Sequence, residues 1–126
     1  MFGLGPTTDG IKAILHGMRA HTSNEKLQMF GFEELGMLAF RNDDHKVKIA
    51  EQGGIQAILN GMRAHTSHNR VQRQGCAVLG LLIFHHDDKI VEQAVQEVLS
   101  DAMTAHPDDE VIRKTAVRVL EDLAKR

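Results

Sequence analysis

The heptapeptide GMRAHTS occupies residues 17–23 and occurs again, letter for letter, at residues 61–67. The two copies start 44 residues apart, and sliding the chain by that distance aligns a whole unit rather than the heptapeptide alone. A third, more diverged copy follows at a shift of about 41 residues. Self-similarity of this kind is typical of a solenoid, in which each unit buries its apolar face only against its neighbours. The sequence therefore predicts one domain over residues 1–126, with units at about 9–42, 43–86 and 87–126.

Apolar residues recur at helical spacing inside each unit. Ile55, Ile58, Leu59 and Met62 stand at positions i, i+3, i+4 and i+7, which is one stripe of an α-helix. The pair Gly53-Gly54 breaks the chain before this middle helix, and a longer segment at 69–84 predicts the most buried helix of the unit, in which the small residues Gly75 and Cys76 allow close packing. No stretch alternates as a strand does, so the predicted fold class is all-α.

Aspartate pairs stand between the units. The pairs at 43–44 and 87–88 offer N-caps for short first helices that would start near His45 and Lys89. The third copy lacks the glycine pair and has alanine instead, which favours continuous helix. We therefore predict that its first and second helices are fused into one helix from Asp88 to about Ala105.

The two ends of the array differ. The first copy has no sequence for its own first helix, so unit one is expected to be incomplete. The last segment, residues 108–126, mixes charged and apolar residues as a capping helix does. Of the two ends, the amino-terminal one is expected to expose more apolar surface. Phe2 and Leu4 are candidates either to fold over this surface or to support self-association.

Three helices per unit, with a Gly-Gly break before the second and a long third helix, resemble the armadillo repeat. The clearest match covers residues 47–59 and 71–82, and the related two-helix HEAT repeat is the main competitor. The resemblance extends over nearly the whole chain. It implies a right-handed α-solenoid of about three repeats.

In armadillo arrays the third helices line a concave groove that receives extended peptides or partner segments. Members that read nuclear-import signals carry a tryptophan, with an asparagine four residues later, on this helix. This chain has no tryptophan, and no asparagine at the matching positions, which argues against that recognition. The resemblance implies a mixed groove whose candidate contacts are Glu33, Met37, Arg73, Ala77, Leu81, Lys114, Arg118 and Asp122. For Met37 and Leu81, packing against an adjacent helix and exposure in the groove both remain open.

Composition narrows the classes of partner. The formal net charge is −2, so no global basic field exists to hold a nucleic acid. No apolar run approaches the roughly 20 residues of a membrane helix, so we expect a soluble protein with no membrane partner. The single cysteine, Cys76, fits a reducing compartment, and we expect the cytoplasm, with the nucleus as the alternative.

Residue types that often carry chemistry are present but do not form a recognised site. His21, His65 and His106 recur by repeat, and neighbouring helices about 8–10 Å apart cannot bring such histidines onto one zinc. Each is expected to end a middle helix and to meet its unpaired carbonyls. Cys76 lies on a packing surface, and Glu33 and Glu34 are adjacent on a helix and point apart. We predict no enzyme activity, no catalytic residue, no metal and no cofactor.

The sequence thus predicts a scaffold that binds a peptide or a partner protein through the concave surface of the third helices. The alternative is a structural or self-assembling repeat module that forms homo-oligomers through its exposed apolar amino-terminal end.

Overall fold

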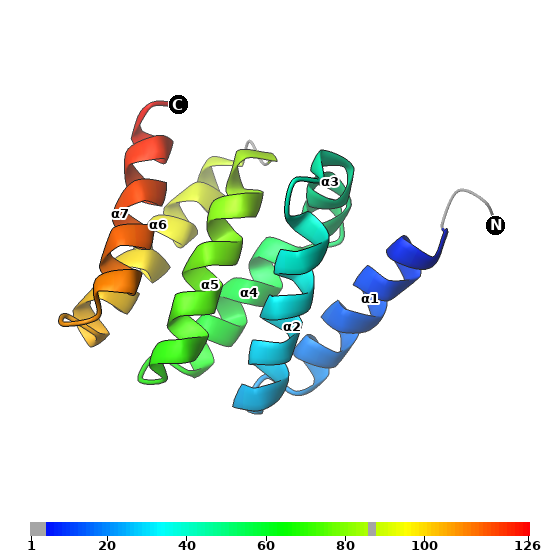
Figure 1. The fold of residues 1–126 in the computed structure, drawn as a ribbon, viewed down its shortest axis with the longest axis horizontal. Helices are drawn as coiled ribbons and strands as arrows, with labels where there is room; N and C mark the ends of the chain where they lie inside the picture. The colour runs from blue at the N-terminus through cyan, green and yellow to red at the C-terminus, as the bar shows by residue number, and fades with distance from the viewer. Residues whose placement is uncertain (1–4, 86–87) are drawn as a thin grey trace.

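The computed structural model describes residues 5–85 and 88–126, which fold into an α-solenoid (Figure 1). In chain order its elements are α1 (Gly5–Ala20), α2 (Glu25–Ala39), α3 (Asp43–Glu51), α4 (Gly54–Ala64), α5 (Asn69–Leu82), the 3-10 helix η1 (Ile83–His85), α6 (Lys89–Ala105) and α7 (Glu110–Ala124). The helices α2, α5 and α7 lie side by side in one layer, and α4 and α6 lie behind α5 and α7. The helix α1 flanks α2 at the amino-terminal end.

The hydrophobic core lies between these layers and includes the apolar stripe predicted for the middle helix of unit two. Ile55, Ile58, Leu59 and Met62 are each at most 2% exposed. Gly53 precedes α4 with φ at +80°, a left-handed conformation that favours glycine. The predicted close packing at Gly75 is confirmed, because a Cβ atom there would overlap the Met62 side chain.

The fused helix predicted for the third unit is confirmed. The helix α6 runs without interruption from Lys89 to Ala105 and passes through Ala94, where unit two has Gly53. The Asp88 side chain caps it by accepting a hydrogen bond from the Ile90 N–H at 2.8 Å. Alanine in place of glycine removes the conformational freedom that breaks the chain between α3 and α4.

The predicted start and cap of α3 were wrong. The helix begins at Asp43, and Asn42 is its N-cap, accepting from the His45 N–H at 3.0 Å. Asparagine caps a helix as well as aspartate does. Starting earlier also places Asp43 and Asp44 in the first turn, where carboxylates favour the positive end of the helix dipole.

Two of the three recurring histidines join neighbouring units. His65 and His106 directly follow α4 and α6, as predicted, but their rings do not meet carbonyls of their own helix ends. The Nε2 atom of His65 lies 2.7 Å from the Thr22 carbonyl oxygen, and that of His106 lies 2.8 Å from the Thr66 carbonyl oxygen. Each ring therefore bridges to the loop of the preceding unit.

Candidate partner-binding surface

We use the term third-helix face for the exposed side of the layer formed by α2, α5 and α7 (Figure 1). The predicted groove residues all lie on these three helices. Most of them are exposed, namely Glu33, Met37, Arg73, Ala77, Lys114 and Arg118, whereas Leu81 and Asp122 are partly buried. The repeat alignment therefore brings six solvent-accessible side chains onto one layer of the solenoid.

The aligned residues Met37 and Leu81 lie in different environments. Met37 is 73% exposed, whereas Leu81 is partly buried and packs against the hydrophobic core. The helix α5 has another third helix on both sides, α2 and α7, whereas α2 has such a neighbour on one side only. Position 81 is thus more enclosed than position 37, and of these two residues only Met37 is largely exposed to solvent.

Met37 borders an apolar hollow on α2. Glu33, Gly36, Met37 and Phe40 line this hollow, and the Phe40 side chain is 61% exposed. Sequence reasoning did not include Phe40 among the groove candidates. The signal was present in the alignment, because Phe40 matches Phe84, which is also exposed at the end of its third helix.

Charged side chains of the candidate set lie at both ends of the third-helix face. In unit one, the Glu33 carboxylate accepts a hydrogen bond from the Gln74 amide at 3.0 Å. In unit three, Lys114 and Arg118 are exposed cations, and Lys114 Nζ lies 3.9 Å from the Glu110 carboxylate. The candidate surface therefore has a carboxylate beside the apolar hollow in unit one, and two cations together with the Asp122 carboxylate in unit three.

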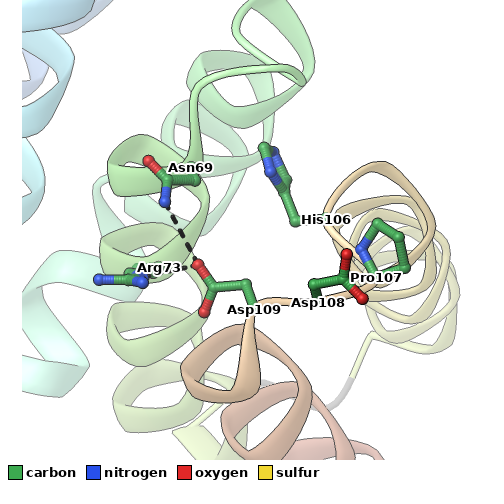
Figure 2. A pocket seen from close by; sticks show the side chains of 6 residues that line it. All are labelled: Asn69, Arg73, His106, Pro107, Asp108 and Asp109. Carbon is green, nitrogen blue, oxygen red and sulfur yellow. Dashed lines mark hydrogen bonds and ion pairs between the residues drawn. The ribbon is translucent and has the colours of Figure 1, made fainter.

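Arg73, another predicted groove residue, takes part in an inter-unit contact. Figure 2 shows Arg73 and Asn69 of α5 directed at Asp109, at the start of α7. The Arg73 Nε–H donates to Asp109 Oδ2 at 2.7 Å, and the Asn69 amide donates to the same oxygen at 3.3 Å. Asp109 also caps α7 by accepting from the Ile112 N–H at 3.1 Å. This polar cluster ties α5 to α7, and both oxygens of the Asp109 carboxylate accept hydrogen bonds in it.

The environment of Asp109 lowers the pKa of its carboxyl below the ordinary value of 3.8. Burial alone would raise this pKa, but the hydrogen bonds and charge of Arg73, together with the bonds from Ile112 and Asn69, outweigh it.

We expect acid to weaken the fold through this group. Because the pKa of Asp109 is lower in the folded chain than in the unfolded chain, its contribution is complete above the unfolded pKa and is lost as the pH falls through the folded pKa. Asp109→Asn keeps a capping oxygen and removes the charge. Urea titrations followed by circular dichroism at pH 7 and below pH 4 should show a smaller acid-induced loss for D109N than for the wild type. Equal losses would contradict this role.

Cys76 is 0% exposed, as its place on a packing surface predicted. Burial, followed by the nearby Asp109 carboxylate, raises the pKa of the thiol to about 12, so it stays protonated at neutral pH. Residues 5–85 and 88–126 contain no group of three or more His, Cys, Asp or Glu side chains that could hold a metal ion. Two adjacent histidines at 85–86 precede the aspartate pair at 87–88, and positions 86 and 87 of this connector lie outside the described residues.

The sequence of this chain matches one known family of repeat proteins. A family model described as the LRRK2 ARM repeat matches residues 8–126. The chain belongs to the LRRK2 ARM repeat family. Comparisons with curated proteins and with solved structures give no match.

Membership of the LRRK2 ARM repeat family confirms the armadillo resemblance and the solenoid fold class. Armadillo repeats typically mediate protein–protein interactions and are non-catalytic scaffolds. None of the helices in the described part of the chain is long and apolar enough to cross a membrane.

Proposed function

We propose that this chain is a non-enzymatic scaffold that binds a segment of a partner protein along the third-helix face. The observation that carries the proposal is the pair Met37 and Phe40, which are 73% and 61% exposed and border one hollow. Exposed large apolar side chains that gather at one place mark interaction surfaces, because covering them releases water from apolar surface. The same two helical turns carry Glu33, which supplies a polar rim.

The chemistry of the face indicates the chemistry of the partner segment. One apolar side chain of the partner would fill the hollow at Met37 and Phe40. An acidic residue further along the segment would meet Lys114 and Arg118 on α7. A segment that lies across the array, from α2 over α5 to α7, would reach both sites, and the side-by-side arrangement of the third helices suits this mode.

A capture experiment with matched variants tests the proposal. The whole chain is immobilised, exposed to extract of its source cells and cross-linked, and bound proteins are quantified by mass spectrometry. We expect Met37→Glu and Arg118→Glu each to weaken capture of a specific partner about tenfold, which corresponds to about 1.4 kcal/mol. Glu33→Lys tests the rim of the hollow in the same assay.

Ile90→Glu is the control, since Ile90 is 79% exposed but lies on α6, outside the third-helix face. Circular dichroism should show that all four variants stay folded, because the replaced side chains are exposed. If M37E, R118E and the wild type form the same cross-links in equal amounts, the partner binds elsewhere than at the third-helix face.

The second candidate function is self-assembly through the amino-terminal end. Phe2 and Leu4, the residues predicted for this role, lie outside the described residues. The observation that favours the candidate is instead Phe30, which is 59% exposed at this end of the array.

A further inference from the structure

The amino-terminal end of the array presents an apolar surface made by α1 and α2. We use the term leading face for this surface, which comprises Ala13, Ile14, Gly17, Leu27 and Phe30. Together with Met18 and Gly31, these residues line a hollow that is almost entirely apolar. Ala13 and Phe30 are exposed, and Ile14, Gly17 and Leu27 are partly exposed.

The leading face repeats a surface that is buried elsewhere in the same chain. The residues of unit two that match Ala13, Ile14, Gly17 and Leu27 are all buried, namely Ala57, Ile58, Gly61 and Val71. Gly61 among them lies against Gln28 and Phe32 of unit one. The matching residues in unit three are Val98, Leu99, Ala102 and Ile112, and all of these are buried as well. The leading face is therefore the continuation of an established helix-packing interface, left open in unit one.

The opposite end of the array does not fit this surface. Two apolar positions of the middle helix face the inside of the stack and are at most 2% exposed in units one and two. They are Ile11 and Leu15 in α1, and Ile55 and Leu59 in α4. In α6 the matching positions carry Gln96 and Ser100, which are exposed. The carboxyl-terminal end of the array therefore presents polar side chains at these positions. If that end covered the leading face of another copy, these polar groups would be buried without partners. Head-to-tail stacking of copies is disfavoured.

The leading face has both a projecting ring and a shallow site. Phe30 projects from α2, whereas Gly17 and Ala13 leave a shallow site on α1. The chain already uses this kind of contact between units one and two, where the Phe32 ring lies over Gly61, so that a Cβ atom on Gly61 would be 3.0 Å from Phe32 Cζ. Two copies related by a two-fold axis would place each Phe30 over Gly17 of the other copy, as an isologous interface requires.

We propose that two copies of this chain pair through their leading faces, with Phe30 of each copy seated over Gly17 of the other. The inference rests on the self-assembly candidate and is independent of binding at the third-helix face. It assigns self-association to Phe30 and Gly17, and the role predicted for Phe2 and Leu4, which lie outside the described residues, stays a prediction.

Sedimentation equilibrium of the full chain across a wide concentration range tests the proposal. The mass of the wild type should rise to that of two chains and no further. Phe30→Asp should remain at the mass of one chain. Gly17→Ala is the more discriminating variant. A Cβ atom at this position meets only Leu27, at 3.9 Å, and alanine favours helix, so the monomer stays folded. The added methyl group fills the site for Phe30. We expect G17A to weaken dimerisation at least tenfold.

Val117→Asp on α7 and Met37→Glu on α2 are the controls, since both residues are exposed and lie outside the leading face, and both variants should dimerise as the wild type does. M37E also separates this inference from the third-helix proposal, which requires M37E to lose partner binding. A wild-type chain that stays monomeric overturns the pairing, as does F30D that still dimerises. Growth beyond the mass of two chains would show open head-to-tail assembly and would equally overturn it.

Discussion

Replacement of Phe32 by alanine should lower the free energy of unfolding by about 3–5 kcal/mol. Phe32 is 0% exposed, and its ring lies over Gly61 at the contact between α2 of unit one and α4 of unit two. The variant removes this apolar contact and leaves a cavity that flanking helices cannot fill, since each is fixed in the stack. In a solenoid such a loss acts on the coupling between neighbouring units as well as on one unit.

The chain supplies its own control for this effect. Phe30 lies on the same helix two residues earlier but is 59% exposed, so Phe30→Ala at concentrations too low for pairing should change the free energy of unfolding by about 0.5 kcal/mol or less. Urea titration followed by circular dichroism at 222 nm measures both variants, because the chain has no tryptophan or tyrosine to report by fluorescence. Equal destabilisation by F32A and F30A would show that the two units are not coupled through this ring.

Helical periodicity and the repeat predicted the fold because both reflect local rules. The stripe from Ile55 to Met62 is buried throughout, and α6 continues through Ala94, where the glycine pair is missing. The position of a helix end is less well determined by sequence, since Asn42 and Asp43 are nearly equivalent as caps. The repeat comparison favoured the aspartate pair only because it recurs.

Contacts between units could not be predicted in the same way. The pattern placed His65 at a helix end, but only the stacking of units brings its ring to the Thr22 carbonyl of the preceding loop. For the candidate surface, the alignment treated Met37 and Leu81 as equivalent, although α5 is flanked by third helices on both sides and α2 is not. The exposure of a repeated position depends on where its unit stands in the array. Phe30 was missed for the same reason.

A further polar contact recurs in units one and two. Gln72 is 2% exposed, and its amide donates hydrogen bonds to the Met62 and His65 carbonyls, both at 2.9 Å. Gln28 makes the same two bonds to Met18 and His21, both at 3.0 Å. Each glutamine therefore holds the end of the middle helix and the following loop against the third helix. The sequence signal was a glutamine that recurs 44 residues later on an otherwise apolar face.

Gln72→Leu should lower the free energy of unfolding by about 2 kcal/mol, since two buried hydrogen bonds are lost at about 0.5–1.5 kcal/mol each. The matching position in unit three carries Arg113, whose side chain is 50% exposed and lies 3.6 Å from the Glu110 carboxylate. Arg113→Leu is therefore the matched control, with an expected change of about 0.5 kcal/mol or less. Because the loop after α4 also carries the His65 bridge to unit one, Q72L should speed amide hydrogen exchange at residues 62–68 more than elsewhere in α4. Uniform exchange across the array, or equal losses of stability in Q72L and R113L, would mean that the glutamine acts as a general core residue and does not hold the loop.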